Sequence, residues 1–579
     1  MDRSRLDRSA SAVHAGTPDD GSDDGRNLTS DAMSQNHAEV LSTIPASESM
    51  LHAADNGPSK RRRLEHSTHN DIHYSGSTSS ILDASHETID HATAEDTCTS
   101  TLYQSRPAPT TEDLGDLFFD SLDPLLFSTP NWTFDEFAHD PNYLASREEL
   151  RTLIFSTAQS AAPSREASPA VVAGDDTAYV DATAAPSAIQ EQMSEVLSQG
   201  RRLEYLKNYV GQVAPWLDMF DSDRTFGIQL PALARHSSAL LYAILALSAR
   251  QMERKGAEKE SFESLELYQG AIRLLTPMLQ GRGEQVIAIC VILCCMEMMS
   301  ASGQDWRRHL EGCAALFDAL GVNGFSGGLL QAVFWCYARM DLCSALISDG
   351  MQGTLFPPSK WLPSHVSHAE SRSLFSESQN ANMHANNSVY LCAQVCQLVC
   401  DRTRFTELGE ANGCTQASFT TRWQNLWDDL QDWLSSRPQD LLPLQTVDAK
   451  PFPHIFFVHW AAISSNQLHH TACILLLSTM PKPLKLPRAP TSSAVWHAKR
   501  ICGISLTNPH QGCLNNAIQP LWVAGRLLSH KAEHAMIVKL IRSIEAMTGW
   551  GTSWRISDLE EAWGYKIQSS RGIATARPH

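Results

Sequence analysis

The segment from Trp306 to Asp349 constrains the fold most, because its apolar residues recur at the three- and four-residue spacing of amphipathic helices. The first apolar stripe ends at Gly321, a residue type that commonly closes a helix in the left-handed conformation. The second stripe includes Asp341 among its apolar residues. A carboxylate on an apolar face is costly unless it is paired or hydrogen-bonded. The segment therefore predicts two packed helices with Asp341 buried in a satisfied polar contact.

Two short motifs lie within this segment. They have the patterns W-x-x-H-x-x-G and F-W-x-Y-x-R-x-D. Their residues are Trp306, His309, Gly312, Phe334, Trp335, Tyr337, Arg339 and Asp341. Through these motifs the chain resembles the α-helical regulatory domain of fungal zinc-cluster transcription factors, in the branch called the second fungal-specific transcription factor domain. The resemblance runs from about Arg147 to Tyr565, and it implies a nuclear regulator that switches metabolic or secondary-metabolite genes.

Helical spacing continues through the rest of the apolar-rich part of the chain. Further stripes run from Ser238 to Lys255, from Phe419 to Trp433 and from Ile537 to Met547. Strand-like alternation next to hairpin signals is hard to find. We therefore predict an all-α fold, in which a superhelical or bundle-like regulatory domain follows a long disordered N-terminal arm.

The composition of the chain changes several times along its length. The first 110 residues contain few large apolar side chains, so they cannot bury enough surface to offset the loss of conformational entropy. A later stretch is rich in Ala, Ser and Pro, which is typical of a linker. We predict a disordered arm at 1–110, an acidic and aromatic segment at 111–157, a linker at 158–190, the helical regulatory domain at 191–567 and a tail at 568–579.

Charge, cysteine usage and hydropathy indicate the compartment. A formal net charge of −18 gives the whole chain no general attraction to nucleic acid. Of its 14 cysteines only Cys98 precedes Cys290, and most lie in apolar runs, as reduced buried thiols do. The N-terminus has no secretory signal, and the longest apolar run, Val286 to Met296, is interrupted by Glu297 and too short to span a bilayer. These features predict a soluble intracellular protein without a membrane segment.

A compact basic cluster stands out in the polar N-terminal part. It consists of Lys60, Arg61, Arg62 and Arg63. Exposed basic tetrapeptides of this kind are bound by nuclear import receptors, so the cluster is a candidate nuclear localisation signal. The alternative is a solvated run of charge in a disordered tail. We adopt the import signal and predict a nuclear location.

The zinc binuclear cluster of the resembled family is missing from the N-terminal part. Such a cluster needs six cysteines beginning C-x2-C-x6-C, and a single cysteine, Cys98, precedes Cys290. Two explanations stay open. The protein is an adaptor or co-regulator that acts through a zinc-cluster DNA-binding partner, or the gene model is incomplete. In either case we expect no direct promoter binding by the 579 residues themselves, because base readout and phosphate contacts both need basic elements.

The stretch between Pro107 and Ser146 contains eight acidic residues and no Lys or Arg. Its acidic residues alternate with leucine and aromatic side chains, Phe137 among them, in a pattern typical of amphipathic activation segments. Such a segment keeps its apolar side chains exposed for a coactivator or the transcription machinery. Alternatively, the stretch packs against the helical domain as an N-terminal extension. Both interpretations stay open.

Several cysteine and histidine clusters invite a metal-site interpretation. The thiols of Cys290, Cys294 and Cys295, and those of Cys392, Cys396 and Cys400, lie in apolar surroundings, which favours core packing. On a helix predicted from Pro453 to Leu477 lie His459, His469, His470 and Cys473. This helix lacks the acidic residue of an H-E-x-x-H site, so a structural role is favoured.

No enzyme signature is present: the sequence has no G-x-S-x-G elbow, no G-x-G-x-x-G after a strand and no phosphate-binding loop. We therefore expect no enzyme activity, no catalytic residue, no cofactor and no metal. A helical enzyme using a Cys/His pair is the least favoured hypothesis. The expected partners are a coactivator or the transcription machinery, a zinc-cluster DNA-binding protein, and a second copy in a homodimer.

Overall fold

The computed structural model describes residues 136–161, 193–256, 262–281, 283–300, 307–348, 350–377 and 380–567. Within these ranges the chain is built of helices, with one two-stranded hairpin, so the prediction of an all-α class is confirmed. None of the described helices has the length and apolarity needed to cross a membrane. The predicted arm at 1–110 lies outside the described residues.

The helices of the first half are α2 (Pro141–Ala161), α4 (Arg202–Asn208), α5 (Ala214–Leu217), α6 (Leu230–Leu233), α7 (Ser238–Lys255), α8 (Glu263–Leu275), α9 (Glu284–Ser300), α10 (Arg307–Leu320) and α11 (Gly328–Ile347). Those of the second half are α12 (His368–Glu377), α13 (Ala381–Glu407), α14 (Gln416–Ser435), α15 (Trp460–Ser478), α16 (Ala494–Thr507), α17 (Gln511–Leu514), α18 (Ile518–Gly525), α19 (Lys531–Thr548) and α20 (Trp554–Trp563). The strands are β1 (Gln445–Val447) and β2 (His454–Phe456), paired antiparallel.

The helices predicted from apolar spacing form where their stripes lie. Helix α7 begins directly after Ser237, whose hydroxyl accepts a hydrogen bond from the Leu240 amide at 3.4 Å and so caps the helix. Helices α10 and α19 end at Gly321 and Gly549, whose φ angles of 66° and 72° lie in the left-handed region. Glycine is favoured there because it has no Cβ to clash with the backbone.

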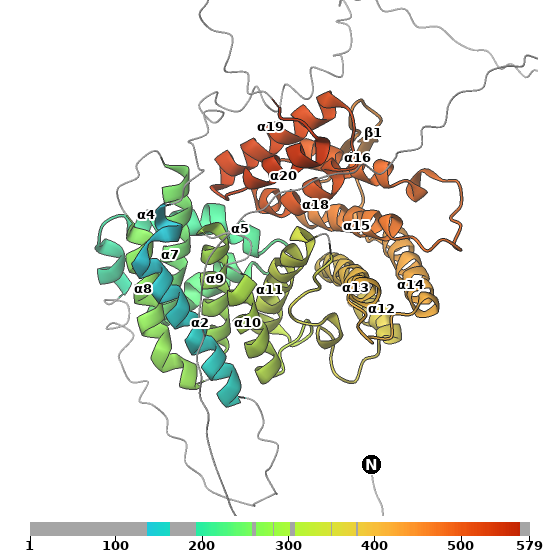
Figure 1. The fold of residues 1–579 in the computed structure, drawn as a ribbon. Coiled ribbons are helices and arrows are strands. Elements are labelled where there is room, and N and C mark those ends of the chain that lie inside the picture. The colour runs from blue at the N-terminus through green and yellow to red at the C-terminus, as the bar shows by residue number, and fades with distance from the viewer. Residues whose placement is uncertain are drawn as a thin grey trace, which may run out of the picture. The chain divides into compact units, whose positions relative to one another are not determined.

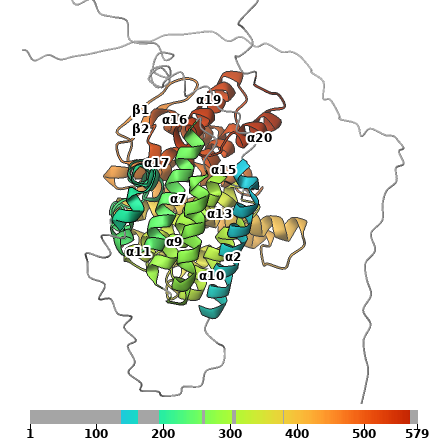
Figure 2. The same ribbon diagram turned by 90° about the vertical axis from the view of Figure 1, so that its left-hand side faces the viewer.

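Helices α9 and α11 lie at the centre of the first half. Helix α9 packs against α7, α10 and α11, and α11 continues the contact to α13 (Figures 1 and 2). Both helices are buried around most of their circumference. A helix that is apolar on every side belongs inside a protein core. The prediction that their cysteines pack in the core is confirmed for Cys290, Cys294 and Cys295.

The second half is a chain of neighbouring helices. Helix α13 packs against α14 and α15, α15 against α16, and α16 against α18, which in turn contacts α19 and α20 (Figure 1). Helix α18 also contacts α11, and α19 contacts α7, so the two halves share one hydrophobic core. Cys392 and Cys396 on α13 are buried in it, and Cys400 is also buried, as expected.

The N-terminal extension packs against the domain over its described part. Helix α2 lies along α10 (Figure 2), with Tyr143, Leu150 and Ile154 fully buried. Phe137, which the activation-segment interpretation places in solvent, is also fully buried, with the Arg250 guanidinium 4.0 Å from its ring centroid. Helix α2 continues to Ala161, past the predicted boundary at 157. The acidic residues from 107 to 135 lie outside the described residues.

The predicted helix from Pro453 to Leu477 is wrong at its N-terminal end. Residues 454–456 form strand β2 instead, with Ile455 buried and Phe456 43% exposed, which is strand alternation. Helix α15 begins only at Trp460, and His459 is its cap: the His459 Nδ1 accepts from the Ala461 amide at 3.1 Å. The backbone N–H and C=O groups of β2 find their hydrogen-bond partners in β1. In a helix the same groups would be paired within the segment itself.

A close backbone contact joins this hairpin to α16. A Cβ placed on Gly503 would lie 2.1 Å from the carbonyl oxygen of Pro453, which is far inside contact distance. We expect Gly503→Ala to lower the free energy of unfolding by about 1–3 kcal/mol, because the hairpin has to move away from α16. Denaturant unfolding of the purified chain measures this change. Gly211→Ala is the control, since a Cβ at Gly211 would meet nothing within 4 Å; equal stability of the two variants would contradict the prediction.

Candidate functional site

The motif residues that the structure describes lie on two adjacent helices. His309 and Gly312 are on α10, and the residues of the second motif, Phe334, Trp335, Tyr337, Arg339 and Asp341, are on α11. All of them are buried. Trp306 lies outside the described residues, as does the basic cluster from Lys60 to Arg63. The second motif therefore builds the interior of the domain.

Asp341 is fully buried, as predicted, and holds the segment after α11 in place. Its Oδ1 accepts from the Leu355 amide at 2.8 Å, and its Oδ2 accepts from the Phe356 amide at 2.9 Å. Burial raises the pKa of Asp341 to about 6, although these two amide hydrogen bonds act in the opposite direction. The Asp341 carboxylate thus accepts the hydrogen bonds of two amides that would otherwise need backbone carbonyl groups as acceptors.

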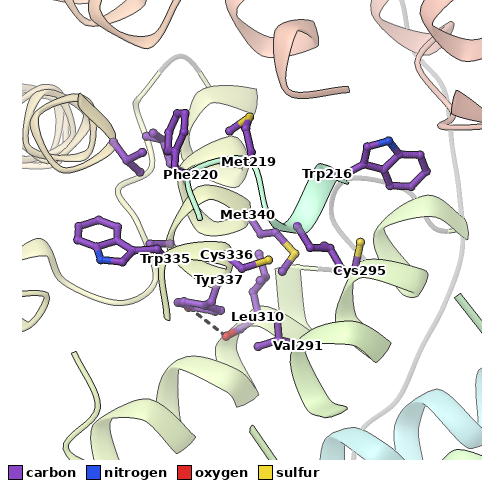
Figure 3. Packing of buried hydrophobic residues seen from close by; sticks show 14 of the residues in the cluster. Trp216, Met219, Phe220, Val291, Cys295, Leu310, Trp335, Cys336, Tyr337 and Met340 are labelled. Carbon is purple, nitrogen blue, oxygen red and sulfur yellow. Dashed lines mark hydrogen bonds between the residues drawn. The ribbon is translucent and has the colours of Figure 1, made fainter. Parts of the chain in front are cut away.

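Tyr337 and its aromatic neighbours surround this contact. The Tyr337 hydroxyl lies 3.3 Å from both the Leu310 carbonyl oxygen on α10 and Asp341 Oδ2, and Figure 3 shows the first of these contacts. Trp335 points to the other side of α11, where its indole N–H donates to the Gly324 carbonyl at 2.8 Å. Edge-to-face ring pairs such as Phe334 with Trp335 complete the cluster.

Arg339 connects α11 to the segment after α5. Its Nη2 donates to the Leu217 carbonyl at 2.5 Å, and its guanidinium carbon lies 5.4 Å from the centroid of the Phe220 ring. Arg339 therefore contacts Leu217 and Phe220 and is not the partner of Asp341. Helix periodicity places two residues that are two positions apart on different faces.

A cavity of about 480 Å³ lies beside Arg339, between α5, α9, α11 and the C-terminal helices. Trp216, Cys295, Cys336 and Met340 are on its wall, and Figure 3 shows them on neighbouring elements. The remaining lining residues are Ala138, His139, Leu217, Arg254, Met298, Met299, Ser300, Arg339, Cys343, Ile347, Asn515, Asn516, Ile518, Gln519, Trp550, Gly551, Thr552 and Trp554.

The wall chemistry of this cavity suits a small, mainly apolar molecule. Nine of the 22 lining residues are tryptophans, methionines or cysteines, and such groups bind planar or apolar ligands. Arg339, Gln519 and Ser300 add a few polar groups that can orient a ligand. Its volume falls in the usual range for ligand pockets, about 300–1,000 Å³. None of the lining residues that the structure describes is acidic.

A second polar group lies between α9 and α10. His309 and Glu297 are both buried, with His309 Nδ1 2.8 Å from Glu297 Oε1, and the Tyr268 hydroxyl donates to the same oxygen at 2.5 Å. Burial is the largest single influence and lowers the pKa of His309, but Glu297 and Cys313 together outweigh it, so this pKa is raised to about 10. The raised pKa favours a protonated His309, which pairs with the Glu297 carboxylate inside the core.

Two thiols lie next to His309. Cys313 is one helical turn further along α10, and Cys294 faces it from α9. A hydrogen bond from Cys294 lowers the pKa of Cys313, and His309 lowers it further, in spite of burial. Cys294, His309 and Cys313 form the one group of three metal-ligating side chains found among the described residues.

The C-terminal histidines form a structural cluster. His470 Nδ1 lies 2.8 Å from His497 Nδ1, and His469 stacks on the Trp433 ring at 5.1 Å between centroids. Burial lowers the pKa of both His469 and His470, and the neighbouring His497 lowers each further. Neutral, stacked imidazoles agree with the structural role that was favoured for His469 and His470.

Sequence reasoning missed His497, Glu297 and the cavity. A signal for Glu297 exists, since it is the one acidic residue at the end of a long apolar run and such a carboxylate needs a buried partner. The cavity has no comparable signal because its walls come from segments hundreds of residues apart in the chain.

The comparison with protein families decides what kind of domain this is. One family model, described as the fungal specific transcription factor domain, matches residues 204–565, which is more than half of the chain. The chain belongs to this family. The resemblance was expected to start near Arg147, whereas the match of the fungal-specific transcription factor domain begins at residue 204, so α2 precedes it. The expected end at Tyr565 agrees.

This fungal-specific transcription factor domain protein is similar to a relative from Alternaria alternata. The relative is named Transcription activator AMTR1, and it is 22% identical over 356 residues. The alignment covers 50% of this chain and 45% of the relative, so the chain matches less than half of that protein's length. No solved structure was found to match the chain.

Proposed function

We propose that this protein is a nuclear transcriptional regulator of the fungal zinc-cluster type that controls metabolic or secondary-metabolite genes. The observation that carries the proposal is the family match over residues 204–565. The name of the Alternaria alternata relative, a transcription activator, supports the same class of function. Under this proposal the helical domain receives a signal, and other parts of the chain or a partner transmit it to the transcription machinery.

The central cavity supports a signal-receiving role for the domain. It lies where α11, which bears the second family motif, meets both the N-terminal and the C-terminal helices. A small molecule bound there would touch Arg339 and Met340 on α11 together with Trp550 from the C-terminal part. Binding energy at such a junction can shift the relative stability of two arrangements of the helices.

Nuclear accumulation is expected to depend on the basic cluster from Lys60 to Arg63. Replacing these four residues with alanine in a full-length fluorescent fusion should move most of the protein to the cytoplasm, because the cluster is the peptide that an import receptor would bind. Fluorescence microscopy of living cells measures the nuclear-to-cytoplasmic ratio. The control replaces Arg3, Arg5 and Arg8, which are basic but dispersed. An unchanged ratio for the cluster variant would show that the import signal lies elsewhere.

A second candidate function is that of an adaptor that reaches DNA only through a zinc-cluster partner. The composition of the sequence favours this role: the net charge is −18, and Cys98 is the single cysteine before Cys290. A partner would then supply the basic residues and the zinc scaffold that contact phosphates and bases. Both candidates use the helical domain. They differ in whether the chain binds promoter DNA itself or only through a partner.

A gel-shift titration tests the adaptor role. The purified 579-residue chain should not bind promoter fragments of the genes whose expression changes when it is deleted, because the acidic chain releases few counterions from DNA. Adding a co-purifying zinc-cluster protein should produce a slower complex that contains both proteins. Competitor-resistant binding by the chain alone at physiological salt would reject the adaptor role and leave the regulator proposal standing.

A further inference from the structure

Helix α9 packs against α10 (Figure 1), and three metal-ligating side chains converge at this contact. The sulfur atoms of Cys294 and Cys313 and one ring nitrogen of His309 all lie within 4.8 Å of one another. Each of the three side chains is at most 2% exposed. His309 and Cys313 are four residues apart on α10, which brings both to the same face of the helix.

The spacing of these atoms is close to that of a tetrahedral zinc site. With Zn–S bonds of about 2.3 Å and Zn–N bonds of about 2.0–2.1 Å, the ligand atoms are about 3.6–3.8 Å apart. The observed separations need only a small inward movement of side chains to reach these values. Two thiolates and an imidazole are also a ligand set that selects zinc over magnesium or calcium.

Glu297 supplies the support that metal-bound histidines usually have. Its Oε1 lies 2.8 Å from His309 Nδ1 and is itself held by the Tyr268 hydroxyl. Histidine ligands commonly bond a carboxylate through the nitrogen that faces away from the metal, which fixes the ring orientation. Both ring nitrogens of His309 are buried, and neither makes a well-directed hydrogen bond to a described residue, but Nδ1 is the one that faces Glu297 and leaves Nε2 without a charged neighbour. Nε2 is therefore the nitrogen available to a metal ion.

We propose that Cys294, His309 and Cys313 bind one zinc ion that fixes α9 to α10, with Glu297 orienting His309. Binding displaces the protons of both thiols and of Nε2, and the ion neutralises the two thiolates that result. Cys290 is one helical turn before Cys294 on α9, and it is close enough to Cys313 for the two thiols to interact. Cys290 is not part of the group whose ligand atoms lie within 4.8 Å of one another, so its side chain would have to move to complete the coordination. This buried site is distinct from a six-cysteine binuclear cluster.

The thiols on α13 give a matched comparison. Cys392 and Cys396 are also buried, four residues apart on one helix, and hydrogen-bonded to each other. No third ligand joins them in the part of the chain that the structure describes. If buried thiol pairs bound zinc nonspecifically, both pairs would do so, whereas the proposal predicts binding only at Cys294 and Cys313.

The test uses the full-length chain, purified under reducing conditions and refolded with zinc present, because a buried site is filled as the chain folds. Elemental analysis should find one zinc ion per chain, and refolding with a chelator should lower the thermal unfolding midpoint until zinc is restored. Cys294→Ala and His309→Ala should lose the ion. Cys392→Ala, which removes an equally buried thiol, should keep it.

Two results would overturn the proposal. One is a wild-type chain that refolds with zinc present and retains no ion after gel filtration. The other is equal zinc content in wild type and Cys294→Ala. If the variants do not fold, cobalt-loaded wild type decides the question: thiolate-to-cobalt charge-transfer absorption is expected, and its absence rejects the site. None of these readouts depends on the proposed transcriptional function.

Discussion

Replacing Glu297 with alanine is expected to lower the free energy of unfolding by about 3–5 kcal/mol, because it leaves a charged His309 buried without its partner. The Tyr268 hydroxyl loses its acceptor in the same variant. Chemical denaturation in the presence of a chelator measures the effect of the ion pair without a metal contribution.

Two further variants test this explanation. Glu266→Ala removes a carboxylate that is 71% exposed and 3.3 Å from Arg202, so its cost should stay below about 1 kcal/mol. Replacing both members of the buried pair, Glu297→Met with His309→Leu, should cost less than Glu297→Ala alone, because no unpaired charge remains. A Glu297→Ala chain as stable as the Glu266→Ala control would show that His309 is neutral in the folded protein.

The sequence predicts the helices of this domain well because their signals are local. Apolar spacing marks α7, α10 and α11, and Gly321 marks the end of α10, all within a few turns of chain. The error at Pro453 has a local cause as well. Three strand residues beside a long apolar helix are too short a segment for alternation to be recognised, and their partner strand comes from residues outside that window.

The candidate sites depend on packing between helices, which spacing within one helix does not report. His309 and Cys313 show a suggestive four-residue spacing, but Cys294 reaches them only because α9 packs against α10. The cavity requires residues from α5 and from the segment around Trp550 to meet. Burial of Asp341 could be predicted because an isolated acid in an apolar stripe already requires hydrogen-bond donors nearby.

Asp341→Ala is expected to lower the free energy of unfolding by about 2–4 kcal/mol near pH 5, since it leaves the amides of Leu355 and Phe356 without an acceptor. Asp341→Asn keeps one acceptor oxygen and should cost less. The matched control is Asp318→Ala, which removes an exposed acid paired with Lys360. Unfolding midpoints of the purified variants give the comparison, and wild-type stability of Asp341→Ala would mean that the segment after α11 is held by other contacts.

The pH dependence of the stability lost in Asp341→Ala shows at which pH Asp341 ionises in the folded protein. Its pKa is raised by burial to about 6, above the value of about 3.9 in an unfolded chain. The folded state therefore binds the proton more tightly than the unfolded chain does. The contribution of Asp341 to the free energy of unfolding is then complete below about pH 4 and decreases as the pH rises to about 6. The stability difference between wild type and Asp341→Ala should accordingly be larger at pH 4 than at pH 7, by on the order of 2–3 kcal/mol. The opposite trend would mean that the amide hydrogen bonds outweigh burial and hold Asp341 ionised throughout.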